Sequence, residues 1–137
     1  MSFHYTTDRA ITAGQFIALL SKTSLGDRRP LRDVSRVEAM LEHANLLGTA
    51  WEGERLIGVA RALSDFAYCC YLSDLAVDED YQRRGVGKAL LAMLQERIHP
   101  EAKIILLSAP LAADYYPRIG FDQHPSAWII GAAQGLR

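Results

Sequence analysis

The sequence predicts one α/β domain with a mixed, mostly antiparallel central sheet of six to seven strands and about four helices. Three observations lead to this prediction. Strand-like and helix-like patterns alternate along the 137 residues, no linker or internal repeat interrupts them, and 50% of the residues are hydrophobic. A chain of this length buries about 68% of the surface that its unfolded form exposes, so one core can stabilise it without a metal or disulfide. We therefore expect a single domain over residues 1–137.

The first third of the chain predicts a strand followed by two helices. Phe3–Thr7 alternates weakly between polar and apolar side chains, as a short strand does. Ala13–Leu20 then carries large apolar side chains at helical spacing. After the polar stretch Ser21–Leu31, Asp33 can cap a second helix whose apolar residues fall on one face.

The middle of the chain predicts three strands. Leu46–Trp51 and Arg55–Leu63 flank a polar connection centred on Gly53, which is typical of an antiparallel hairpin. Tyr68–Val77 is a further apolar run, rich in aromatic and small residues. We expect this run to form a central strand that is buried on both faces.

The last third predicts two more helices and two more strands. From Gly85 to Pro100 apolar residues recur every three to four positions, which indicates the clearest helix of the sequence. Lys103–Ala109 predicts a strand, Leu111–Arg118 a short helix, and Ser126–Gly131 a final strand. The long helix lies between two apolar strands, so we expect one parallel strand–helix–strand unit.

The charge composition argues against broad electrostatic binding of nucleic acid. The chain has 15 Lys and Arg against 16 Asp and Glu, a net charge of −1, whereas such binding needs a strongly basic surface. One local basic cluster is interpreted as a solvated face: Arg28, Arg29, Arg32 and Arg36. The four histidines share no ligand spacing with one another or with the cysteines, so we expect no metal site.

The cysteines and the hydrophobic runs indicate a cytoplasmic protein. Cys69 and Cys70 are neighbours and cannot join distant segments, so we expect reduced core thiols. No hydrophobic stretch approaches the ~20 residues that span a bilayer. Residues Met1–His4 also lack the basic and apolar regions that open a signal peptide.

The connection between the central strand and the long helix is suited to an anion. Residues Val77–Ala89 include two glycines, Gly85 and Gly87, and two arginines. Glycines let backbone N–H groups approach a ligand closely, and the first N–H groups of a helix lack internal partners. We therefore expect a phosphate or pyrophosphate ligand here.

Two common phosphate motifs do not fit this segment. A nucleotide-binding P-loop needs a glycine where Gln82 stands and a hydroxyl residue where Ala89 stands. A dinucleotide-binding fingerprint needs a small residue at Leu90 and a place on the first strand of its domain. An ATPase and a Rossmann enzyme are therefore both disfavoured.

The pattern Gln-x-x-Gly-x-Gly at residues 82–87 resembles the coenzyme A signature of the GNAT N-acetyltransferase superfamily. The resemblance implies the GNAT fold, with backbone amides of the loop on the pyrophosphate of acetyl-CoA. It also implies a bulged strand before the loop, beside which pantetheine lies like an extra strand. The implied cofactor-binding residues are Leu75, Ala76, Val77, Gln82, Arg83, Arg84, Gly85, Val86, Gly87, Lys88 and Ala89.

A second motif, Ser108–Phe121, resembles the short helix and the Tyr-x-x-x-Gly-Phe ending of the same family. Tyr116 takes the position of the family's conserved tyrosine, which implies that it protonates the coenzyme A thiolate. The alternative is that Tyr115 and Tyr116 are only core aromatics. The family's asparagine contact to pantetheine is missing, because Pro110–Ala113 stands at its position.

Acetyl transfer also needs a neutral amine and a stabilised oxyanion. A glutamate that serves as base in many members is absent before Leu75, which leaves Ser73 or Asp74, through a water relay, as candidates. The resemblance implies that the backbone N–H of Leu75 polarises the thioester carbonyl.

The predicted activity is acetyl-CoA-dependent N-acetylation of a small primary amine through a ternary complex. Residues 60–71 and 114–116 look similar to arylalkylamine and serotonin acetyltransferases of plastid type. The alternatives are a protein acetyltransferase acting on Lys or N-terminal amines, and a non-catalytic acyl-CoA sensor. Tyr68, Tyr71 and Trp128 either line an aromatic pocket or belong to the core. The resemblance also implies a homodimer, in which Ser126–Gly131 could pair between subunits.

Overall fold

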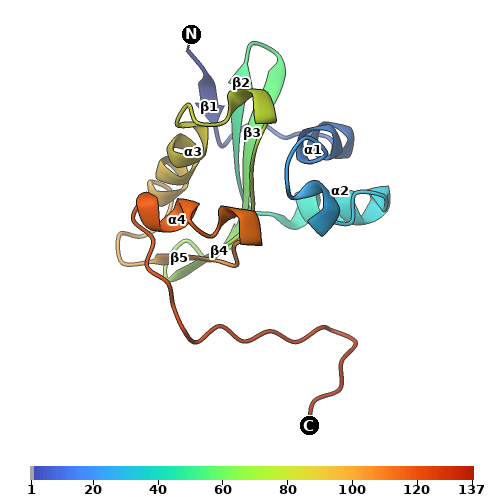
Figure 1. Cartoon of the computed structure of the whole chain (residues 1–137), viewed down its shortest axis with the longest axis vertical. Coiled ribbons are helices and arrows are strands. Elements are labelled where there is room, and N and C mark those ends of the chain that lie inside the picture. The colour runs from blue at the N-terminus through green and yellow to red at the C-terminus, as the bar shows by residue number, and fades with distance from the viewer. Residues whose placement is uncertain (1) are drawn as a thin grey trace.

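The computed structural model describes residues 2–137 and contains one five-stranded sheet with helices on both faces (Figure 1). The strands are β1 (His4–Thr6), β2 (Leu46–Glu52), β3 (Arg55–Ser64), β4 (Cys69–Val77) and β5 (Lys103–Leu106). The helices are α1 (Ala13–Leu20), α2 (Val34–His43), α3 (Val86–Gln95) and α4 (Tyr115–Arg118). Three short 3-10 helices are η1 (Gly26–Arg28), η2 (Glu79–Tyr81) and η3 (Pro110–Ala112).

The strands lie in chain order, β1-β2-β3-β4-β5, and all neighbours are antiparallel except β4 and β5. The β2–β3 turn uses Gly53 at φ +57°, a conformation that suits glycine. The β3–β4 turn is held by the Asp65 carboxylate, which accepts N–H bonds from Ala67, Tyr68 and Cys69 at 2.8–3.0 Å. The helix α3 connects the parallel pair, as the sequence predicts.

Two apolar cores lie on opposite faces of the sheet. One packs α3 against the sheet and includes Leu72, Leu90 and Leu94, all at most 2% exposed. The other lies beneath α1 and α2 and includes Phe16 and Trp51. Figure 1 shows these two pairs of layers, with α1 and α2 on one side of the sheet and α3 and α4 on the other.

The prediction of six to seven strands is wrong, because the structure has five. Residues 126–131 form no strand: Trp128 is 93% exposed and Ile130 53%. A strand exists by pairing with an edge, and this tail runs away from the sheet instead (Figure 1). The predicted helix 111–118 is divided into η3 and α4, because Pro117 cannot donate a helical N–H bond and its ring crowds the preceding turn.

The prediction that β4 is buried on both faces is also wrong. Tyr71 is 43% exposed, as are its register neighbours Leu63 on β3 (41%) and Ile105 on β5 (56%). These side chains lie at an end of the sheet that is open to solvent on that face. For the same reason Cys69 is exposed, so the core-thiol prediction holds only for Cys70, whose pKa is raised by burial.

No helix within residues 2–137 has the length and apolarity to cross a membrane.

Candidate active site

The parallel strands β4 and β5 pair over only four residues, from Cys69 with Lys103 to Leu72 with Leu106. Beyond Leu72 the strand β4 continues to Val77 while the chain after β5 turns towards η3. A cleft of about 50 Å³ opens at this divergence. Its walls come from β4, from the segments around β5 and α4, and from the α1–α2 connection: Ser24, Leu25, Arg29, Leu72, Ser73, Leu75, Leu106, Leu107, Ala109, Ala112 and Tyr116.

The free edge of β4 presents backbone groups to this cleft. In an antiparallel pair only alternate residues exchange hydrogen bonds with the opposite strand. The Asp78 N–H donates to the carbonyl of Ile57, on β3, at 2.8 Å. The even-numbered residues of this part of β4 therefore direct their backbone N–H and C=O groups towards β3. The odd-numbered Val77 accordingly turns its carbonyl away from β3 and accepts a bond from Gln82 Nε2 at 3.1 Å. Leu75 has the same orientation, so its N–H points to the free edge.

A β-bulge interrupts β4 beside the cleft. Arg61 pairs with Asp74 and the next residue of β3 pairs with Leu72, so Ser73 has no partner on β3. The extra residue changes which face the side chains take. Leu72 therefore packs into the core beneath α3, whereas Ala76 packs into the core beneath α1 and α2. The bulge that the family resemblance implies is present.

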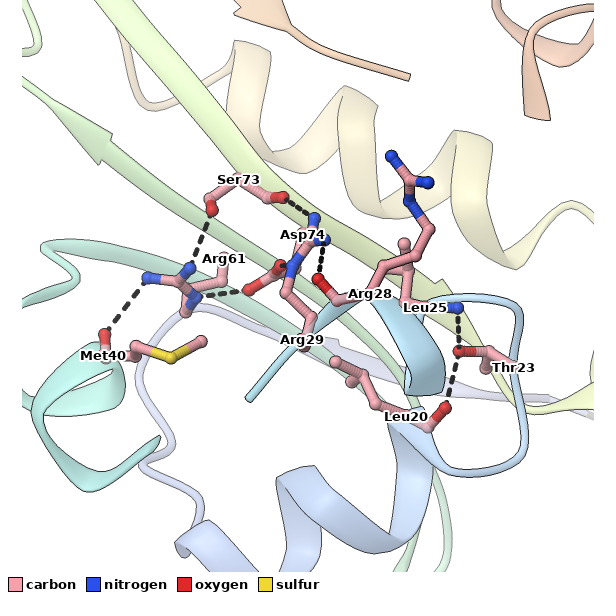
Figure 2. Close-up of polar contacts among 9 residues, drawn as sticks. All are labelled: Leu20, Thr23, Leu25, Arg28, Arg29, Met40, Arg61, Ser73 and Asp74. Carbon is pink, nitrogen blue, oxygen red and sulfur yellow. Dashed lines mark hydrogen bonds and ion pairs between the residues drawn. The ribbon is translucent and has the colours of Figure 1, made fainter. Parts of the chain in front are cut away.

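The bulge directs the fully buried carboxylate of Asp74 towards two arginines (Figure 2). Arg29 Nε donates to Oδ1, and Arg61 Nε donates to Oδ2 at 2.5 Å. Arg29 Nη2 also donates to the Ser73 carbonyl, and Arg61 Nη2 to Ser73 Oγ, both at 2.7 Å. The bulge is thus fixed by two guanidinium groups.

This arrangement limits what Asp74 and Ser73 can do in chemistry. Each oxygen of Asp74 holds a guanidinium, and its side chain is 0% exposed. The Asp74 carboxylate therefore suits a positioning role better than the role of proton acceptor. Ser73 lines the cleft, but its hydroxyl accepts from Arg61.

Tyr116 lies across the cleft from the bulge, on α4. Its ring makes edge contacts with Tyr115 and Phe121, with ring centroids 5.3 and 5.4 Å apart. Burial raises the pKa of the Tyr116 phenol, the neighbouring Tyr115 raises it further, and Arg29 lowers it. The phenol is therefore protonated at neutral pH and can donate a proton or hydrogen bond into the cleft.

The predicted phosphate loop lies between η2 and α3. Arg83 and Gly85 have positive φ angles of 64° and 81°, so the chain turns sharply before the helix begins. Gly85 is the N-cap and supplies no side-chain acceptor, which leaves N–H groups of the first turn for a ligand. A Cβ on Gly87 would lie 2.8 Å from the Tyr115 hydroxyl, so α4 packs closely over the start of α3.

The structure brings several of the predicted residues together and separates others. Ser73, Leu75 and Tyr116 line one cleft. The side chain of Ala76 instead joins the core beneath α1 and α2. The three aromatic residues expected in a pocket or the core are in neither, because they are exposed and absent from the cleft walls: Tyr68, Tyr71 and Trp128.

Sequence reasoning missed Arg29 and Arg61 as site residues. A signal was present, because Arg61 interrupts one apolar strand segment and Asp74 interrupts the next. Opposite charges in two buried, neighbouring strands suggest a buried ion pair. Across residues 2–137, no three His, Cys, Asp or Glu side chains gather as a metal site would require.

A model of a protein family matches most of this chain. The model described as "Acetyltransferase (GNAT) domain" matches residues 30–129, which is more than half of the chain. The chain therefore belongs to the GNAT acetyltransferase family, and the resemblance of the two motifs is confirmed.

Two curated relatives come from plants. "GCN5-related N-acetyltransferase 2, chloroplastic" of Arabidopsis thaliana is 37% identical over 83 residues, which cover 57% of this chain and 31% of that protein. "Histone acetyltransferase TAP1" of Glycine max is 31% identical over 112 residues, covering 70% of this chain and 47% of the relative. The chain thus spans about a third to a half of the length of these relatives.

Solved structures share the fold. A probable acetyltransferase from methicillin-resistant Staphylococcus aureus has a TM-score of 0.76 at 20% identity, with 95% of this chain and 99% of that chain covered. AAC(6')-Iy, in complex with the bisubstrate analogue CoA-S-monomethyl-acetylneamine, has a TM-score of 0.69 at 16% identity, covering 96% and 98%. The predicted α/β GNAT fold with four helices is therefore confirmed, apart from the number of strands.

Proposed function

We propose that this chain transfers the acetyl group of acetyl-CoA directly to a primary amine of a small molecule. The observation that carries the proposal is the free edge of β4 beyond Leu72, with Tyr116 on one side and the glycine turn at Gly85 beyond its end. A backbone edge, an anion-binding turn and a neutral phenol are the three parts that a thioester of coenzyme A requires.

Each part has a separate role in the proposed reaction. The N–H groups at the start of α3 bind the pyrophosphate, and the edge of β4 aligns the pantetheine arm. Leu75 N–H donates to the thioester carbonyl oxygen and stabilises the oxyanion that forms there. The amine nitrogen forms a bond to the carbonyl carbon, the carbon–sulfur bond breaks, and Tyr116 gives its proton to the departing sulfur. The proton that the amine loses passes to solvent and restores the phenol.

Two observations support a small acceptor. The cleft measures about 50 Å³, and its walls come from β4, the α1–α2 connection and the segments around β5 and α4. A protein of the same fold, AAC(6')-Iy, is in complex with an analogue that joins CoA to an acetylated neamine. The Glycine max relative is named a histone acetyltransferase, so a protein acceptor is the second candidate.

A thiol-release assay with paired acceptors tests the proposal. Acetyl-CoA and a panel of small amines, compared with Lys-containing and N-terminal peptides, should release free thiol fastest with a small amine. Thiol release with peptides alone would indicate that the acceptor is a protein amine and not a small molecule. Binding of acetyl-CoA without release from any acceptor would favour a non-catalytic sensor.

A further inference from the structure

One charged side chain lines the cleft, and it is cationic. Of the residues that form the walls, only Arg29 carries a charge, and its side chain is 20% exposed. Arg29 also lies close enough to Tyr116 to lower the pKa of that phenol against the effect of burial. A substrate that reaches the reacting atoms must therefore pass or contact this guanidinium.

The positive charge of Arg29 is not cancelled locally. Asp74 is the one carboxylate in contact with it within residues 2–137, and Asp74 also pairs with Arg61. The other partners of the two guanidiniums are neutral oxygens, the carbonyls of Arg28, Met40 and Ser73 and the Ser73 hydroxyl. Two arginines and one carboxylate leave the cluster with a net charge of +1.

Arg29 keeps hydrogen-bond donors for a ligand. A guanidinium has five N–H groups. Arg29 uses Nε on Asp74, one Nη2 hydrogen on Ser73 and one Nη1 hydrogen on Arg28. One hydrogen on each Nη therefore has no hydrogen-bond partner within residues 2–137, and such N–H groups can donate to the oxygens of a carboxylate.

We propose that the acceptor is an amine that also carries a carboxylate, and that Arg29 binds this carboxylate. The inference rests on the proposed acetyl transfer and names its substrate class. Asp74 and the Ser73 carbonyl hold the guanidinium in place, so little side-chain freedom is lost on binding. Polyamines and Lys-rich peptides are disfavoured, because their additional ammonium groups meet a positive charge.

Matched acceptors test the proposal in the unmodified chain. Tryptophan is compared with tryptamine, and phenylalanine with phenethylamine, by kcat/KM for thiol release. A charged hydrogen-bond pair should favour each amino acid by at least about tenfold. Binding of N-acetyltryptophan and N-acetyltryptamine to the CoA-saturated chain, measured by calorimetry, should show the same preference without turnover.

Variants test whether Arg29 is the source of the preference for amines that carry a carboxylate. Arg29→Gln should reduce the kcat/KM ratio of each amino acid to its matched amine to near one, and Arg29→Lys should keep a part of this preference. Arg32→Gln, in the same basic cluster, should keep the preference fully. Arg32 is exposed and lies outside the cleft walls. Where Arg29→Gln does not fold, Arg29→Lys and the unmodified chain still decide the question.

Several results would overturn the inference. These are equal or faster turnover of the amines without a carboxylate, no product preference in calorimetry, or a preference that survives Arg29→Gln. If free thiol is still released with an amine in these cases, acetyl transfer stands while the substrate class falls. Absence of both acetyl-CoA binding and thiol release would instead remove the proposed function itself.

Discussion

Replacement of Asp74 by Asn tests the buried cluster that fixes the bulge. Asp74 is fully buried and holds Arg29 and Arg61 through its two oxygens. Removing one partner of a buried ion pair costs about 3–5 kcal/mol of unfolding free energy, because the remaining charges stay buried and uncompensated. The unfolding entropy at the melting temperature is about 2.1 cal/mol/K per residue, or roughly 0.29 kcal/mol/K for a chain of 137 residues. Asp74→Asn should therefore lower Tm by about 10–17 °C.

The assay is thermal and urea unfolding of Asp74→Asn beside a matched control, Asp80→Asn. Asp80 also pairs with an arginine, Arg55, at 3.4 Å, but its side chain is 70% exposed. An exposed pair contributes about 1 kcal/mol or less, so Asp80→Asn should change Tm by no more than about 3 °C. Equal effects of the two variants would refute the reasoning, because burial would then not distinguish the pairs.

Three further predictions concern the phenol of Tyr116, the glycine turn at Gly85 and the β3–β4 turn. Tyr116→Phe should lower kcat by about a hundredfold or more with unchanged acetyl-CoA affinity, whereas Tyr115→Phe should change kcat little. Because burial raises the pKa of Tyr116 above its usual 10.0, the decline of kcat in the unmodified enzyme should begin only above that pH; full turnover by Tyr116→Phe would contradict both expectations. Gly85→Ala and Gly53→Ala each place a side chain at positive φ, +81° and +57°, and each should cost about 1–2 kcal/mol in unfolding free energy. Only Gly85→Ala should also weaken acetyl-CoA binding in calorimetry, so equal affinities would exclude the turn from the binding site. Backbone N–H bonds from Tyr68, Cys69 and Ala67, the largest effect first, lower the pKa of Asp65 from 3.8 to about 2. The stabilising contribution of Asp65 is thus present above pH 3.8 and lost as the pH falls through about 2; an NMR titration midpoint near 3.8 would contradict it.

Local signals predict the elements whose structure depends on neighbouring residues in the chain. The hairpin around Gly53 is expected at 46–51 and 55–63, and it forms at 46–52 and 55–64. The helix expected from Gly85 begins at Val86. Both depend on turn residues and periodicity that a short window contains.

The environment of Asp74 could not be predicted in this way. The residues of β4 alternate regularly between buried and less buried positions, as in an ordinary strand. The bulge at Ser73 nevertheless moves the buried residues from one core to the other, and only the register with β3 reveals it. Arg29 reaches Asp74 from 45 positions earlier in the chain, so no local pattern connects the two.

In the final segment the sequence predicts a strand that the structure does not contain. The apolar residues of 126–131 have strand-like composition, but no edge of the sheet pairs with them. Strand propensity describes a fit to a pleated, half-buried surface, and it has no effect where that surface is missing. The exposed patch at Tyr71 has a related cause, because the extent of helix cover is set by tertiary packing.

The measurement that tests the central claim most directly is thermal unfolding of the full chain with increasing acetyl-CoA. A ligand that binds only the folded state at a hundred times its Kd adds about 2.7 kcal/mol of stability. For 137 residues this raises Tm by about 9 °C. Coenzyme A itself should also raise it, because the site proposed at the Gly85 loop contacts the part that the two molecules share. An unchanged Tm up to millimolar acetyl-CoA would contradict the assignment of the β4 edge and the glycine turn to coenzyme A.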